Sequence, residues 1–105
     1  MDGVAYLIQK TYTEDTLGQR IPTEEKQVEI FVSVDSVSRR EWADAGRNGY
    51  NPERKLTTAA INYSGEAEIM YEGVRYAIYR TYTPPDTDVV ELYLHRKAGV
   101  QNGKG

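Results

Sequence analysis

The chain has 105 residues, a net charge of −3 and a hydrophobic fraction of 39%, which together predict one small, water-soluble domain. A pI near 5.1 argues against a dedicated duplex-DNA binder, because such proteins present a strongly basic surface. The lack of cysteine excludes disulfide scaffolds, Zn–Cys sites and thiol catalysis. We expect no membrane association and no secretory signal, since the longest apolar run is Val4-Ala5-Tyr6-Leu7-Ile8 and the chain opens with Met1-Asp2-Gly3.

Alternating polar and apolar residues predict two strands in the N-terminal third of the chain, over residues 4–13 and about 25–34. Residues 14–19 between them have turn composition, and Pro22 is expected in the same connection. The second strand has the clearest period of two in the chain. Its apolar face would carry Val28, Ile30, Val32 and Val34.

Residues 35–55 break this alternation and are predicted to form one long loop. Ser38 and Glu41 make a capping-box pattern, in which Ser38 caps a short helix and Glu41 reaches back to the Ser38 amide. Gly46 and the Asn48-Gly49 pair are expected to end that helix. The segment is nearly neutral but densely charged, so we expect an exposed excursion from a β framework.

Alternation returns after the loop and predicts four more strands, at residues 56–63, 67–71, 74–83 and 89–95. Glu72-Gly73 predicts a tight hairpin turn. In the strand over 74–83, the period of two places one set of side chains on a common face. They are Val74, Tyr76, Ile78, Arg80 and Tyr82.

Six short strands separated by turns predict a mostly β fold, namely a small six-stranded β-barrel with one long loop that carries a short helix. We expect a single domain over residues 1–97 and a flexible tail over residues 98–105, because the tail has linker composition.

No group of residues makes a credible catalytic site, so we expect neither an enzyme nor a bound metal or cofactor. His95 is the sole histidine and is predicted to be an ordinary residue at a strand end. Glu66 and Glu68 lie two apart on a strand, which is typical of one solvated face rather than of paired catalytic carboxylates.

Tyrosine and arginine are concentrated in the C-terminal strands, and such residues form the stacking surface of small barrels that bind single-stranded nucleic acid. The acidic pI removes the electrostatic attraction that this binding uses. We keep it as an alternative function. The residues that would carry it are Tyr76, Tyr79, Tyr82, Tyr93, Arg75 and Arg80.

An ordered set of segments runs through most of the chain. The segments are Lys10-Thr11-Tyr12-Thr13-Glu14-Asp15, Leu17-Gly18-Gln19, Val34-Asp35-Ser36-Val37-Ser38-Arg39-Arg40-Glu41, Ala45-Gly46-Arg47-Asn48-Gly49, Pro52-Glu53, residues 71–82 and Val90-Glu91-Leu92-Tyr93. In order and spacing, from about residue 5 to 96, this set resembles the head-closure proteins (head–tail connectors, or stoppers) of long-tailed phages and prophages of Gram-positive bacteria.

The resemblance implies a structural virion protein that assembles as a ring beneath the adaptor ring on the portal vertex. Such a ring retains packaged DNA and gives the tail a docking surface. The partners implied are the adaptor, a tail or tail-completion protein, further copies of the chain and, without sequence specificity, packaged DNA. The location implied is the virion neck, and the host cytoplasm before assembly. A tail-completion protein is the alternative within the same particle.

In that family the long loop faces the channel or the neighbouring subunits. The basic side chains of this loop, residues 35–55, are therefore candidates for contact with DNA phosphate or with acidic neighbours. The alternative is that the loop is solvated and contacts neither. The two large aromatic residues either pack on their own barrel or contact a partner. The candidates are Arg39, Arg40, Trp42, Arg47, Tyr50, Arg54 and Lys55.

Overall fold

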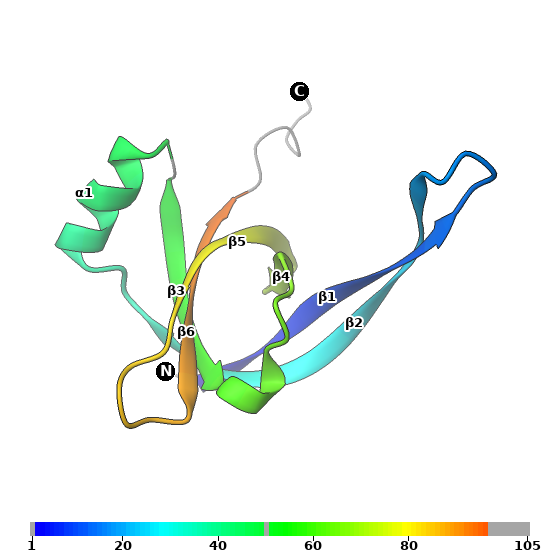
Figure 1. Cartoon of the computed structure of the whole chain (residues 1–105). Helices are drawn as coiled ribbons and strands as arrows, with labels where there is room; N and C mark the ends of the chain where they lie inside the picture. Colours follow the sequence, from blue (N-terminus) through cyan, green and yellow to red (C-terminus); the bar gives the residue numbers. More distant parts are fainter. Residues whose placement is uncertain (1, 50, 97–105) are drawn as a thin grey trace.

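The computed structural model describes residues 2–49 and 51–96, and over these ranges the chain forms a closed antiparallel barrel of six strands (Figure 1). The order around the barrel is β1-β2-β3-β6-β5-β4. A helix, α1 (Arg39–Arg47), lies in the connection between β2 and β3. The predicted fold, a mostly β six-stranded barrel with a long loop carrying a short helix, is confirmed. The strands are β1 (Asp2–Glu14), β2 (Arg20–Asp35), β3 (Pro52–Ala59), β4 (Glu68–Tyr71), β5 (Val74–Tyr82) and β6 (Val89–Arg96).

The core fills the barrel with alternate side chains from every strand. The period of two predicted for β2 is confirmed, because Ile30 and Val32 are buried and Val34 packs against the same cluster. Burying a large aliphatic side chain stabilises the fold by roughly 1.5–3 kcal/mol, so the central leucines and isoleucine dominate. The largest fully buried side chains are Leu7, Leu56, Ile69, Leu92 and Leu94.

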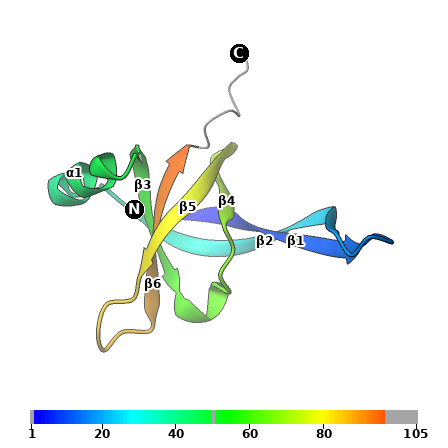
Figure 2. The same ribbon diagram turned by 45° about the horizontal axis from the view of Figure 1, so that its top comes forward.

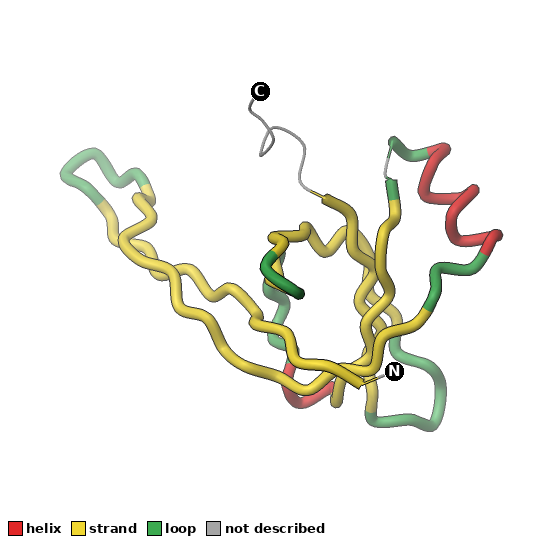
Figure 3. Tube along the Cα trace, turned by 180° about the vertical axis from the view of Figure 1, so that it is seen from behind, coloured by secondary structure: helices red, strands yellow, loops and turns green. Residues whose placement is uncertain are grey.

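The β1–β2 hairpin is much longer than the barrel wall (Figures 1 and 2). β4 pairs with β1 at Ala5–Ile8, and β3 pairs with β2 at Ser33–Asp35. Beyond these pairings the hairpin projects from the barrel, and we call residues 9–26 the arm. Figure 3 shows from behind that the arm and α1 lie on opposite sides of the barrel, as in Figure 1.

The prediction that Pro22 lies in a connection was wrong, because β2 begins at Arg20 and Pro22 pairs with Tyr12 inside the hairpin. Proline has no backbone N–H and is tolerated in strands at edges and irregularities. Here the register shifts between Thr11 and Tyr12, beside the proline. The arm therefore keeps its pairing past a residue that usually ends a strand.

Two boundaries around the long loop also differ from the prediction. β3 begins at Pro52, so the excursion outside the strands spans residues 36–51, and residues 52–55 lie in the barrel wall. β3 ends at Ala59, after which η1 (Ala60–Asn62) forms a single 3₁₀ turn closed by the bond from the Tyr63 N–H to the Ala60 carbonyl. The predicted tail, residues 98–105, lies outside the described residues.

The tight turn between β4 and β5 is confirmed, since Glu72 and Gly73 both have positive φ angles, of 52° and 77°. Two consecutive residues with positive φ give the turn that matches the twist of paired strands. A short β4 is thereby joined directly to β5, and the pair closes the barrel against β1.

One extra residue in β5 changes which side chains face outward. Ile78 pairs with Leu94 and Arg80 pairs with Tyr93, so Tyr79 is the additional residue of a β-bulge. The prediction that Arg80 shares a face with Ile78 was wrong for this reason. Ile78 packs against the core, whereas Tyr79 and Arg80 both bond to α1 on the outside of the barrel.

Candidate functional site

The helix α1 begins as predicted, with Ser38 as its N-cap. The Ser38 Oγ accepts a hydrogen bond from the Glu41 N–H at 3.1 Å. The second half of the capping box is replaced by a contact with the barrel. The Glu41 carboxylate accepts a bond from the Tyr79 hydroxyl at 2.9 Å and bonds from Arg80 at 2.7 and 3.3 Å. A charge-assisted bond from a guanidinium is stronger than one from a neutral amide, which favours this arrangement.

We call Glu41, Tyr79 and Arg80 the helix anchor. Its central carboxylate is 12% exposed, so its bonds are only weakly screened by water. Burial, together with the bond to Glu41, raises the pKa of Tyr79, and the bond to Glu41 raises the pKa of Arg80. The hydroxyl therefore keeps its proton and the guanidinium its charge throughout the physiological pH range, and the helix stays attached.

The anchor continues into the barrel wall through Tyr93. The Arg80 guanidinium lies 4.2 Å from the centre of the Tyr93 ring, which is a cation–π contact. Burial, together with the bond from the Tyr93 hydroxyl to Glu91 at 2.8 Å, raises the pKa of Tyr93 to about 12. The Lys55 Nζ is 3.6 Å from the other Glu91 oxygen. Lys55 is thus part of the wall of the barrel rather than of a basic loop.

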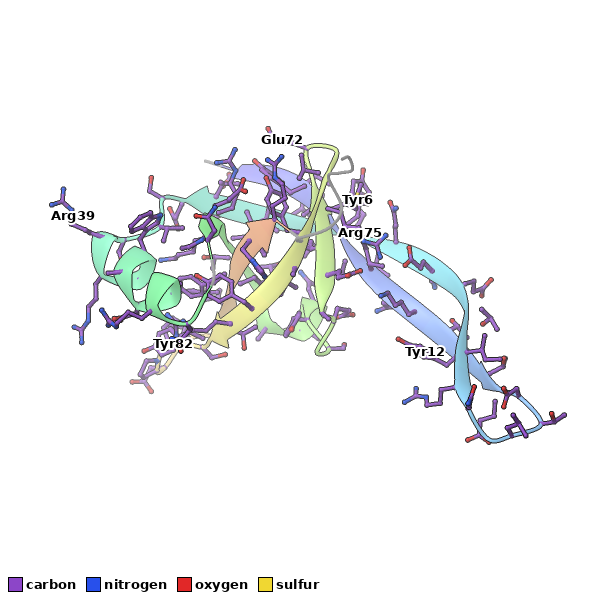
Figure 4. The ribbon with its side chains drawn as sticks, turned by 90° about the horizontal axis from the view of Figure 1, so that it is seen from above. Tyr6, Tyr12, Arg39, Glu72, Arg75 and Tyr82 are labelled. Carbon is purple, nitrogen blue, oxygen red and sulfur yellow. The ribbon has the colours of Figure 1, made fainter. Side chains whose placement is uncertain are left out.

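The outer surface of α1 carries its arginines. The Arg40 and Arg47 side chains are 93% and 71% exposed, and both pair with Asp44 of the same helix. Arg39 extends away from the helix and the barrel (Figure 4). We call Arg39, Arg40 and Arg47 the basic helix face. Three arginines against one aspartate make it a positive surface on an acidic chain.

Trp42 lies next to this face and is 57% exposed. It lines a surface groove between α1 and the ends of β2 and β3, together with Val37, Pro52 and Arg54. Of the candidate residues, the structure therefore brings Arg39, Arg40 and Arg47 onto one helix surface and Arg54 beside Trp42. Lys55 lies in the barrel wall, apart from these residues, and Tyr50 lies outside the described residues.

A second charged cluster, which the sequence did not reveal, holds the base of the arm. Arg75 lies beside the base of the arm (Figure 4). Its guanidinium donates to Glu68 at 3.0 Å and to both oxygens of Glu25 at 2.7 and 3.1 Å, and the Lys10 Nζ is 3.4 Å from Glu68. We call these four residues the arm anchor. It joins the hairpin β4–β5 to both strands of the arm.

The prediction that Glu68 belongs to a solvated face was wrong, because Glu68 is 5% exposed. A carboxylate can be buried when cations pair with it, and Arg75 and Lys10 supply two. Lys10 and Glu25 lie directly opposite each other in the hairpin, but the predicted strands, residues 4–13 and about 25–34, do not give this register. The partner on β5 could not be found without the barrel closure, which brings residues 68 and 75 to the arm.

The tyrosines proposed for nucleic-acid stacking are mostly engaged elsewhere. Tyr76 is in the core, Tyr93 lies beneath Arg80, and the Tyr79 hydroxyl bonds to Glu41. Tyr82, with 45% of its surface exposed, is the one with an open ring. Because stacking of successive bases needs several exposed rings, these residues do not form a platform.

His95 packs edge-on against the Tyr79 ring, with the ring centres 5.6 Å apart, and burial lowers its pKa. Within residues 2–49 and 51–96, no group of three His, Asp or Glu side chains is placed to hold a metal ion. The one α-helix found in these ranges is too short and too polar to cross a membrane.

Comparison with known proteins gives no family assignment. No protein-family model matches the chain, and no curated protein matches it significantly.

Proposed function

We propose that this chain is a head-closure protein of a phage neck, a structural subunit that forms a ring beneath the adaptor, retains packaged DNA and provides the surface on which the tail docks. The proposal rests on the ordered resemblance through most of the chain. A small barrel with one excursion between β2 and β3 agrees with what that resemblance implies.

The structural observation that supports the proposal is the basic helix face, held on the outside of the barrel by the helix anchor. In a ring, each subunit would present the same face, so a net negative chain would still offer a repeated band of arginines. Arginine side chains bind phosphate without reading sequence, which is what retention of packaged DNA requires.

Single-stranded nucleic-acid binding is the weaker alternative, because Tyr82 alone among its four tyrosines has an open ring. That function predicts oligonucleotide binding that weakens steeply with salt and is lost in Tyr79→Ala or Tyr82→Ala.

The deciding experiment is electron microscopy of particles from a lysate in which this gene is deleted. Emptied heads beside free, complete tails are the expected result. Heads joined to short or aberrant tails would reassign the chain to tail completion. Normal infectious particles would overturn both neck functions and make oligonucleotide titration the next measurement.

A second experiment tests the basic helix face itself. Complementation of the deletion with Arg40→Glu/Arg47→Glu should give particles that assemble but lose DNA, because the reversed charges repel phosphate. The control is Lys26→Glu/Glu29→Lys, which rearranges exposed charge on β2 away from α1 and keeps the net charge. Full DNA retention in the Arg40/Arg47 variant would remove this face from the mechanism.

A further inference from the structure

The arm and the α1 side of the barrel are the two parts of the molecule that project furthest, and they carry opposite charge. The outer part of the arm, residues 11–24, has three acidic residues and one basic residue. The acidic residues are Glu14, Asp15 and Glu24, and the basic residue, Arg20, lies 4.5 Å from the centre of the Tyr12 ring.

The arm also ends in an exposed apolar group. Leu17 is 80% exposed at the turn, and Tyr12 and Ile21 are 41% and 43% exposed behind it. The Asp15 carboxylate accepts bonds at 2.9 Å from the N–H groups of Leu17 and Gln19. The turn is therefore held in one shape, and ordering Leu17 on binding costs less than it would in a loose loop.

The groove beside Trp42 offers a complementary surface. Trp42 and Val37 supply apolar area, Arg54 lines the groove, and Arg39 lies one helical turn from Trp42 on the same side of α1. Two acidic residues, Asp35 and Glu53, also line it, and Glu53 is bonded to Arg96 at 3.2 Å. The groove lining alone has one arginine against two carboxylates, and Arg39 with Arg96, the partner of Glu53, brings this side to three positive and two negative charges.

We propose that the arm of one copy packs on the α1 side of the next copy, with Leu17 in the groove against Trp42 and the acidic outer part of the arm facing Arg39 and Arg54. Arm and α1 lie on opposite sides of the barrel, so the contact joins two different surfaces and repeats head to tail (Figures 1 and 3). A head-to-tail contact with a suitable rotation closes into a ring. This inference rests on the proposed function and assigns the contact between subunits of the ring. Of the basic helix face, Arg39 then contacts the neighbouring subunit, and Arg40 and Arg47 face DNA.

The absence of cysteine in the chain makes a direct test possible, because any disulfide must come from the residues introduced. Thr16→Cys places a thiol beside Leu17, and Ser36→Cys places one on the groove, with both native contact residues retained. The two purified variants are mixed in equal amounts and oxidised mildly. The matched control replaces Ser36→Cys by Ser64→Cys, an exposed serine on another surface.

The expected result is that the mixed 16–36 disulfide exceeds the mixed 16–64 disulfide by about tenfold, because the contact raises the local concentration of one pair of thiols. Adding Arg39→Glu to the Ser36→Cys variant should reduce this excess, and adding Glu14→Lys/Glu24→Lys to its partner should restore it. Equal yields of the two mixed disulfides at millimolar protein would overturn the contact.

Failure of this contact and failure of the proposed function give different results. Equal disulfide yields together with emptied heads in the deletion lysate leave a neck protein that assembles by another surface. A strong 16–36 disulfide together with normal particles in the deletion leaves a self-associating barrel without the neck function.

Discussion

The arm and α1 both project from the barrel, and each is held to it by a cluster of charges with a glutamate at its centre. In the arm anchor the glutamate, Glu68, belongs to the barrel and binds cations from the arm and from β5. In the helix anchor the glutamate, Glu41, belongs to the projecting element and binds two donors from β5. Both clusters use one strand, β5, as their fixed support.

The difference lies in what else holds each element. The arm continues the β1 and β2 strands of the barrel, so its backbone pairing runs from the core outward, with one register shift between Thr11 and Tyr12. The excursion leaves the sheet at Asp35 and returns at Pro52, and α1 depends on side chains for its attachment. Damage to the arm anchor should therefore spread to the whole barrel, whereas damage to the helix anchor should remain local.

Glu68→Gln should have the largest effect. The change leaves Arg75 and Lys10 beside a neutral, buried amide. Because both cations are partly exposed to water, we expect the loss of this ion pair to lower the free energy of unfolding by about 2–3 kcal/mol. Urea denaturation measures it. Glu24→Gln, an exposed carboxylate on the same arm, is the control and should leave the midpoint unchanged. Equal midpoints for both variants would mean that pairing of the strands alone holds the arm.

Glu41→Gln should act on α1 alone. Loss of the charged acceptor weakens three hydrogen bonds, and we expect hydrogen exchange of the α1 amides to become about tenfold faster while the amides of β6 keep their protection. Asp44→Asn is the control, because Asp44 pairs with arginines of its own helix. Faster exchange in β6 would contradict a local role for the helix anchor.

Tyr79→Phe should have a smaller effect, of about 1 kcal/mol on the local opening of α1, since it removes one hydrogen bond and keeps the ring. The same change in the Glu41→Gln background should cost much less, because its charged partner has gone. A double-mutant cycle on α1 exchange rates gives the coupling. Additive effects would show that the tyrosine supports the helix by packing instead of by its hydroxyl.

The smallest expected effect is a loss of stability in acid, in two steps. Burial lowers the pKa of His95, so the neutral form of its side chain favours the folded state. This contribution to stability is complete above the ordinary pKa of 6.5 and is lost as the pH falls through the lower pKa of the folded state. The bond from Arg75 lowers the pKa of Glu25, so its contribution is lost further down, below 4.5. Thermal melts across pH 3–8 measure both steps, and His95→Gln should remove the upper one alone. A melt that is flat between pH 7 and 5 would contradict the first step.

The strands and the barrel could be predicted because alternation is a local property, and β2 shows it most clearly in Ile30, Val32 and Val34. The residues that form the two anchors could not be predicted from the sequence. A bulge at Tyr79 shifts every later side chain of β5 to the opposite face, and nothing in the local pattern marks the extra residue. Glu41 looked like a capping residue because its spacing from Ser38 is right, but the tertiary contact with Arg80 overrides the local one.

Glu68 illustrates the same limit at the arm. Its neighbours along β4 are apolar, which a solvated strand would not require, but its burial depends on cations at residues 10 and 75 that only the closed sheet brings near. The exposure of Arg39, Arg40 and Arg47 could be predicted, because helical spacing places them away from the side of α1 that carries Glu41. Lys55 was not, because the loop boundary was set four residues too late.

The length of the arm has a consequence for solubility. A two-stranded hairpin that leaves its sheet bares rows of backbone N–H and C=O groups along both outer edges, and such edges can recruit further strands into fibrils. Here charges recur along both strands, and Pro22, which has no N–H, removes one backbone donor from β2. Charged residues and proline along an edge oppose the pairing of a further strand, and the arm carries several such residues. They include Lys10, Glu14, Arg20, Pro22, Glu24 and Lys26.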